Sequence, residues 1–149
     1  MDEGQYAAII LAAAGLIRLG LEARIRNAIS PELSIPAVGQ GALGIEINAS
    51  RTDLLAILAP LNHADTQVCI EAERGMSRAL AGSCTVPLGA YATCKADKIH
   101  ITGFVASVDG TQMLVESTSG SRNQAEALGK ALADQLRAKG ADQILALLD

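Results

Sequence analysis

The sequence is poor in aromatic residues, and it has neither a long apolar run nor an excess of basic charge. Its 149 residues include no Trp, one Phe and two Tyr, so any core must be built from aliphatic side chains. The formal net charge of −4 provides no basic face to displace counterions from phosphates, which argues against nucleic-acid binding. The longest apolar stretch, residues 6–16, is about half of the ~20 residues that a membrane-spanning helix needs, so no membrane partner is expected.

Cysteine is also scarce: the three cysteines are Cys69, Cys84 and Cys94. An odd number without metal-ligand spacing is not typical of a disulfide framework or a zinc site, so no metal is expected. The chain begins with the acidic Met1-Asp2-Glu3, where a secretory signal would be basic. We therefore expect reduced thiols and a cytoplasmic location.

The first 35 residues have the pattern of a partial α/β segment. Residues 6–14 form an unbroken apolar run, which is typical of a strand buried on both faces of a parallel sheet. Residues 15–26 predict a helix that is interrupted at Gly20. Because a parallel strand needs neighbours and none precedes this one, we expect the chain to begin inside a domain.

A linker with Ser-Pro and Ile-Pro pairs, residues 30–36, separates this segment from a glycine-rich turn at residues 38–44. The turn predicts a strand at residues 42–48. A short helix should follow, capped by Ser50 or Thr52 and ending at Leu58.

The rest of the chain predicts a compact α+β domain. Asp65 is the expected N-cap of a first helix, residues 66–81. Two alternating runs flank Asp109-Gly110, which is a hairpin turn signal, and Gly140 should end the longer C-terminal helix. The expected elements are strands at 86–93, 98–108 and 112–118 and helices at 124–138 and 142–148. Three antiparallel strands with helices on one face follow from this order.

Cys84 is the main candidate for chemistry. It lies between the first helix and the first strand of this domain, among small residues that leave a thiol open to approach. The alternative is a buried cysteine packed as a small hydrophobic residue, which is what we expect for Cys69 and Cys94. Arg74 and Arg78, spaced i, i+4, either face Cys84 or form a solvated helix face.

Two other kinds of site fit the sequence poorly. His63 and His100 are the only histidines, and their settings suggest no catalytic base; His100 is expected at the surface of a strand. The turn Gly39-Gln40-Gly41 lacks the Lys-Ser/Thr ending of a phosphate-binding loop and the full GxGxxG pattern.

Three segments together resemble the porphobilinogen deaminase family. Residues 73–89, ERGMSRALAGSCTVPLG, resemble its cofactor-attachment signature and are the most specific of the three. Residues 36–46, PAVGQGALGIE, resemble its interdomain segment, and residues 7–21, AAIILAAAGLIRLGL, resemble the last strand and helix of its second domain. Leu61-Asn-His63 also fits, and the segments occur in the family's order.

The resemblance implies a transferase that condenses four porphobilinogen molecules into hydroxymethylbilane and releases ammonia. It implies a dipyrromethane cofactor held as a thioether by Cys84. Arg18 then matches an arginine that binds pyrrole carboxylates, Gln40 a polar contact in the cleft, and Ala12 a cofactor-facing strand end. The catalytic aspartate of the family belongs to a first domain that this sequence lacks, so no catalytic residue is expected here.

The same resemblance divides the chain into three parts. Residues 1–35 would be the end of domain 2, residues 36–60 a crossover with a remnant of domain 1, and residues 61–149 the cofactor-anchoring domain 3. The chain alone is then expected to be inactive, and the full-length protein a monomer. The alternatives are a stand-alone module that binds a small molecule or a protein, and an unrelated cysteine-dependent enzyme.

Overall fold

The structure, a computed structural model, describes residues 2–80 and 86–148. The chain divides into two compact units, Met1–Ser34 and Ile35–Asp149. Cys84 lies outside the described residues.

The unit Met1–Ser34 contains one short helix, α1 (Ala13–Arg18), and a 3-10 turn, Glu22–Arg24. Gly20 lies between them with φ of +70°, so the helix expected at residues 15–26 is interrupted there as predicted, but it is much shorter. The strand expected at residues 6–14 is wrong for this chain, because residues 6–12 are irregular and exposed. A strand buried on both faces needs a partner on each edge, and the described residues of this unit contain no strand.

The unit Ile35–Asp149 begins with a segment that is largely exposed. The expected strand at residues 42–48 is also absent; these residues are irregular. A short helix follows as predicted, α2 (Asp53–Leu58), and then a 3-10 turn at Ala59–Leu61 that contains Pro60. Thr52 occupies the N-cap position of α2, although its side chain makes no capping hydrogen bond.

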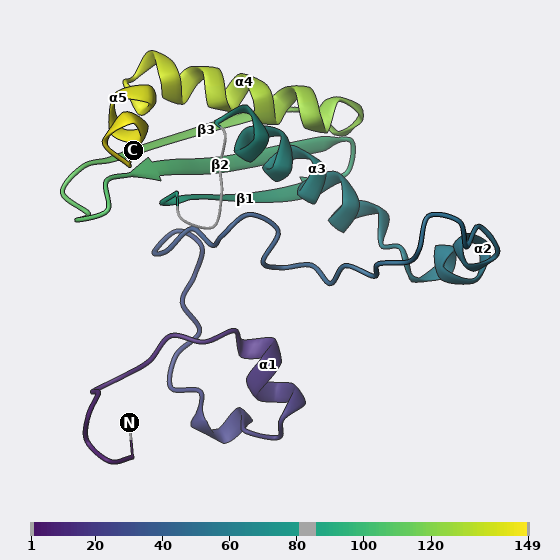
Figure 1. Cartoon of the computed structure of the whole chain (residues 1–149), viewed down its shortest axis with the longest axis horizontal. Coiled ribbons are helices and arrows are strands. Elements are labelled where there is room, and N and C mark those ends of the chain that lie inside the picture. The colour runs from purple at the N-terminus through teal and green to yellow at the C-terminus, as the bar shows by residue number, and fades with distance from the viewer. Residues whose placement is uncertain (1, 81–85, 149) are drawn as a thin grey trace. The chain divides into compact units, whose positions relative to one another are not determined.

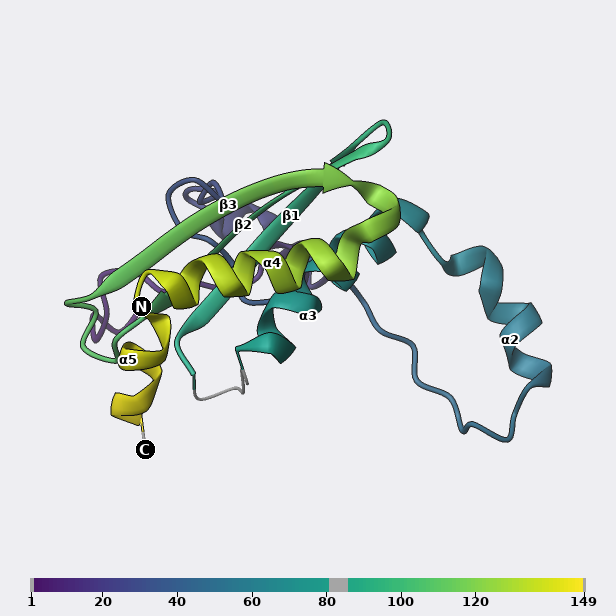
Figure 2. The same cartoon turned by 90° about the horizontal axis from the view of Figure 1, so that it is seen from above.

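The remainder of this unit is the predicted α+β domain (Figure 1). Its elements are α3 (Ala64–Ala79), β1 (Leu88–Lys95), β2 (Lys98–Ala106), β3 (Met113–Ser121), α4 (Ala125–Ala138) and α5 (Ala141–Leu145). The strands form an antiparallel sheet in the order β1-β2-β3, and α3 and α4 lie on the same face of it (Figure 2).

Local signals explain most of the element boundaries in this domain. Gly110 has φ of +70° in the β2–β3 turn, where Asp109 Oδ1 accepts a hydrogen bond from the Thr111 amide at 3.1 Å. Gly140 has φ of +103° and ends α4, as expected. The predicted N-cap is wrong, because His63 Nδ1 accepts from the Thr66 amide and begins α3, while Asp65 lies within the first turn.

The core between the helices and the sheet is aliphatic and contains glycine contacts. Ala72 and Met76 of α3 are fully buried among side chains from β2 and α4, including Ile99, Ile101, Val105, Leu132 and Leu136. A Cβ atom added to Gly129 would lie 2.0 Å from the Ala72 carbonyl oxygen, and one added to Gly75 would lie 2.6 Å from the Glu126 carbonyl oxygen. The backbones of α3 and α4 therefore touch, which only glycine permits at these positions.

Replacement of Gly129 by alanine should destabilise this domain. Overpacking against a rigid backbone carbonyl costs about 1–3 kcal/mol or more, which exceeds the ~1 kcal/mol that alanine gains in helix propensity. Urea unfolding measures the difference. The control is Gly15→Ala in α1, where an added Cβ meets no atom within 4 Å, so this change should leave the domain's unfolding unchanged. Equal stability of Gly129→Ala and the wild type would contradict the close helix contact.

Candidate functional site

The segment that carries Cys84 is fixed at both of its described ends. On one side, Leu80 follows α3 and is 3% exposed within the core. On the other side, the Pro87 carbonyl oxygen accepts a hydrogen bond from the Ala106 amide of β2 at 2.9 Å. Cys84 thus lies in the sequence between two points that are anchored to the domain.

Gln40, the second predicted site residue of this unit, lies in a tight turn and is exposed. Its amide donates to the Ala37 carbonyl oxygen at 3.1 Å, and its side-chain Oε1 accepts from the Ala37 amide at 3.1 Å. Gly39, with φ of +75°, allows the turn. The side-chain oxygen of Gln40 is used within the turn. Its NH₂ group therefore remains available to donate a hydrogen bond to a ligand.

A buried carboxylate holds this turn on the domain. Glu73 of α3 is 5% exposed. Its Oε2 accepts a hydrogen bond from the Gly39 amide at 2.8 Å, and its Oε1 accepts from the Ala92 amide at 2.9 Å. β1 is an edge strand, so Glu73 satisfies an amide that no second strand could pair. One side chain therefore joins α3, β1 and the turn that contains Gln40.

A second contact packs the segment that leads into the same turn against β1. A Cβ atom added to Gly89 would lie 2.5 Å from the Pro36 carbonyl oxygen and 2.5 Å from the Phe104 ring. Glycine at this position leaves room for both groups. The 36–41 segment is thus packed on the start of β1, next in the sequence to the segment that carries Cys84.

Sequence reasoning did not single out Glu73, although a signal was present. Cys69, Ala72, Met76 and Leu80 recur at i, i+3, i+7 and i+11, which marks the buried stripe of α3. Glu73 lies on that stripe, and a charged residue at such a position needs polar partners. Burial raises the pKa of its carboxyl group, and the hydrogen bonds from Gly39 and Ala92 oppose that rise.

The other two predicted site residues belong to the unit Met1–Ser34. Ala12 is the N-cap residue of α1 and Arg18 is its last residue, and both are exposed. The helix spans six residues, so about 9 Å of helix axis separates its ends. Gln40 and Cys84 lie in the other unit, and the grouping of all four residues around one ligand stays a prediction.

The cationic and imidazole side chains considered from the sequence have structural partners or lie at the surface. Arg78 forms an ion pair with Glu126 of α4 at 3.3 Å, and Arg74 is exposed. His100 is exposed on β2, as expected, and its Nδ1 lies 2.8 Å from the Ser119 hydroxyl on β3. Among the described residues, no group of three or more His, Cys, Asp and Glu side chains could hold a metal ion.

The described part of the chain also contains no helix that is long and apolar enough to cross a membrane.

Glu73→Gln should destabilise the domain by about 1–3 kcal/mol, because the amide keeps one acceptor and leaves one of the two N–H groups unpaired. Since the folded pKa of Glu73 is raised above the ordinary value of ~4.3, its stabilising contribution is present at lower pH and is lost as pH rises through the folded pKa. The difference in unfolding free energy between wild type and variant should therefore shrink from pH 4.5 to pH 7. Urea unfolding at several pH values measures it.

The matched control for this prediction is Glu71→Gln, an exposed position on the same helix. It should change stability by less than about 0.5 kcal/mol. A pH-independent difference for Glu73→Gln would show that Glu73 does not titrate differently in the folded state.

Comparison with known proteins assigns both parts of the chain to one family. Residues 1–56 match the family description "porphobilinogen deaminase, dipyromethane cofactor binding domain", and residues 67–138 match "porphobilinogen deaminase, C-terminal domain". The first match contains Ala12, Arg18 and Gln40, and the second contains Cys84 and Glu73.

Individual relatives agree with this assignment. The chain is 69% identical over 148 residues to a porphobilinogen deaminase from Methylobacillus flagellatus, covering 99% of this chain and 48% of the relative. It is 55% identical to one from Thiobacillus denitrificans and 53% identical to one from Laribacter hongkongensis, each covering 97% of this chain and 47% of the relative. The chain thus spans about half the length of these curated relatives. It belongs to the porphobilinogen deaminase family and contains part of that family's dipyrromethane cofactor-binding domain.

Proposed function

We propose that this chain is the cofactor-anchoring part of an enzyme that condenses four porphobilinogen molecules into hydroxymethylbilane with release of ammonia. The observation that carries the proposal is the segment 73–89, which contains Cys84, in a chain 69% identical over 148 residues to a porphobilinogen deaminase. In this proposal Cys84 holds dipyrromethane through a thioether.

The donor set of the chain suits such a cofactor. Loss of ammonia from porphobilinogen leaves an electron-poor methylene carbon, and a soft thiolate is the nucleophile that forms a lasting bond with it. Cys84 would supply that sulfur, lose its thiol proton and hold the methylene carbon through a C–S bond that resists hydrolysis. The bound dipyrromethane then supplies the pyrrole end on which the product is built.

Arg18 is proposed to bind the acetate and propionate groups of the pyrroles. A guanidinium group binds a carboxylate through two parallel hydrogen bonds, and Arg18 is exposed at the end of α1. The Gln40 NH₂ group would add a hydrogen bond to a pyrrole substituent, and Ala12 would leave space beside the cofactor. Glu73 acts indirectly, because it fixes the turn that carries Gln40.

The chain is proposed to need the N-terminal half of its family to work. Residues 1–35 would complete domain 2, residues 36–60 would return to domain 1, and residues 61–149 would form domain 3. An apolar hollow supports the second assignment: its lining includes Leu43, Ile45, Ile47, Leu55 and Leu58. We propose that the N-terminal half found in the relatives covers this surface and supplies the catalytic aspartate. We also propose that the full-length protein is a cytoplasmic monomer that binds neither nucleic acid nor membrane.

The 149-residue chain alone should therefore form no hydroxymethylbilane from porphobilinogen. Co-expression with the N-terminal half of the Methylobacillus flagellatus relative should restore the activity. It should also add the mass of two linked pyrrole units to the peptide that contains Cys84. Intact mass under denaturing conditions and a product assay measure these outcomes.

Cys84→Ser is the control, because serine keeps the size but lacks the soft nucleophile. In the complemented protein it should show neither added mass nor activity. Stable covalent cofactor in Cys84→Ser, or a mass added at Cys69 or Cys94 instead, would overturn the anchor assignment. Turnover by the chain alone would overturn the need for a second half.

Arg18→Leu should lower kcat/KM of the complemented enzyme at least about tenfold, because a charge-assisted hydrogen bond contributes about 1.5–3 kcal/mol. Arg26→Leu is the matched control, since Arg26 is also exposed in the same unit but lies outside the segment that resembles the family. Similar activity of both variants would remove Arg18 from the site.

A further inference from the structure

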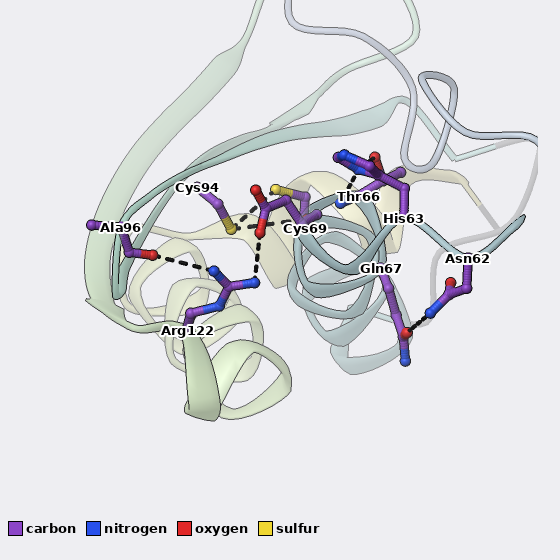
Figure 3. A network of polar contacts seen from close by, with 9 residues as sticks. Asn62, His63, Thr66, Gln67, Cys69, Cys94, Ala96 and Arg122 are labelled. Atoms are coloured by element: carbon purple, nitrogen blue, oxygen red, sulfur yellow. Dashed lines mark hydrogen bonds and ion pairs between the residues drawn. The ribbon is translucent and has the colours of Figure 1, made fainter. Parts of the chain in front are cut away.

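Two thiols that the proposed reaction does not use lie beside each other in the C-terminal domain. Cys69 of α3 and Cys94 of β1 are both half-buried, and their sulfur atoms are 3.5 Å apart (Figure 3). The Cys69 thiol donates to Cys94 Sγ, and the Cys94 thiol reaches the Asp65 carbonyl oxygen at 3.9 Å. A disulfide needs about 2.05 Å between the sulfurs, so closure requires a shift of about 1.5 Å.

The register of α3 against β1 fixes this proximity. Glu73 follows Cys69 by four residues on α3, and its carboxylate binds Ala92, which precedes Cys94 by two residues on β1. Four helical residues rise about 6 Å and two strand residues rise about 6.6 Å, so the two steps match. The buried Glu73–Ala92 contact therefore sets the sulfurs opposite each other.

The surroundings make the two thiols unequal. Burial, with the neighbouring Cys94 as a second cause, raises the pKa of the Cys69 thiol to about 12, so Cys69 stays protonated at neutral pH. Arg122 lies on the Cys94 side of the pair, where it binds Asp65 at 2.6 Å and donates to the Ala96 carbonyl oxygen at 3.3 Å (Figure 3). The pKa of Arg122 is raised mainly by its hydrogen bond to Asp65. The guanidinium group and the S–H group donated by Cys69 thus both lie on the Cys94 side of the pair, which favours Cys94 as the sulfur that reacts first.

We propose that Cys69 and Cys94 are a modification site that forms a reversible disulfide when the chain meets a hydroperoxide. The Cys94 sulfur attacks the peroxide and breaks its O–O bond; its thiol proton joins the leaving oxygen, so Cys94 becomes a sulfenic acid while water, or an alcohol from an alkyl hydroperoxide, leaves. The Cys69 sulfur then displaces the sulfenic oxygen; its thiol proton joins that oxygen, so this second step yields one disulfide and one water molecule. A dithiol reductant reverses the reaction by thiol–disulfide exchange.

The disulfide would close a loop that includes residues 70–93, which contains Glu73 and Cys84. Oxidation would thus tie together the two elements that flank the Cys84 segment. The inference concerns the unit Ile35–Asp149 by itself and stands whether or not the proposed function holds.

The test uses the full chain carrying Cys84→Ser, because trypsin leaves Cys84 and Cys94 in one peptide, residues 79–95, and Cys69 in residues 52–74. Hydrogen peroxide in native buffer should link these two peptides with the loss of two hydrogens, and dithiothreitol should release them. From the loop length, the oxidised chain should melt roughly 10 °C higher than the reduced chain.

Two single variants in the same background test the order of events. Cys69→Ser should leave Cys94 as a sulfenic acid that dimedone labels, and Cys94→Ser should leave Cys69 unmodified. Linked peptides that form only in denaturant, or only between two chains, would overturn the proposal. Labelling of Cys69 in Cys94→Ser would overturn the assignment of Cys94 as the first thiol oxidised.

Discussion

The backbone contact between α3 and α4 is the constraint on which the rest of the C-terminal domain depends. Gly75 and Gly129 let the two helices meet at the distance of touching peptide groups, which fixes the rotation of α3 about its axis. With that rotation set, Ala72 and Met76 face the core. The neighbouring position, Glu73, then faces the edge of the sheet, where the Ala92 amide has no strand partner. A glycine pair in the core thus determines where the buried carboxylate lies.

Glu73 links the core helix α3 to the turn that contains Gln40. Its burial is costly, because a carboxylate loses hydration, and two amide hydrogen bonds offset part of the cost. These bonds reach residues that are 34 and 19 positions away in the sequence, so one side chain joins the turn of Gln40, helix α3 and strand β1. The Pro36–Gly89 contact adds a second restraint on the same turn. Glu73, which contacts no proposed ligand, therefore positions Gln40, which is proposed to contact one.

The sequence predicted the parts of this chain whose partners are local. The hairpin at Asp109-Gly110 and the end of α4 at Gly140 were correct, because turn chemistry and helix termination depend on a few adjacent residues. The strands expected at 6–14 and 42–48 were wrong, because an apolar run forms a strand only where another strand pairs with it, and the described residues place none beside these two segments. The loop position made Cys84 a candidate, but its role as a cofactor anchor and the choice of Arg18 came only through the family resemblance. The Cys69–Cys94 pair was missed, because it depends on a contact between distant elements that no single segment displays. Glu73 was missed although its position on the buried stripe of α3 was visible; only its partners, Gly39 and Ala92, lie beyond the reach of a single segment.

Under the proposed function, a chain with three thiols must direct an electrophilic carbon to one of them. Burial keeps Cys69 protonated, since its pKa is raised to about 12, and a protonated thiol is a poor nucleophile. Cys94 is half-buried against α3, so a ring-sized electrophile has less access to its sulfur than a small peroxide has. The contacts that set the two sulfurs opposite each other thus limit their reaction with an electrophilic pyrrole carbon more than their reaction with a peroxide. Under the two proposals, pyrrole capture falls to Cys84, whereas a small peroxide reaches the Cys69–Cys94 pair. That separation depends on the Glu73–Ala92 register, and so on the glycine contact that orients α3.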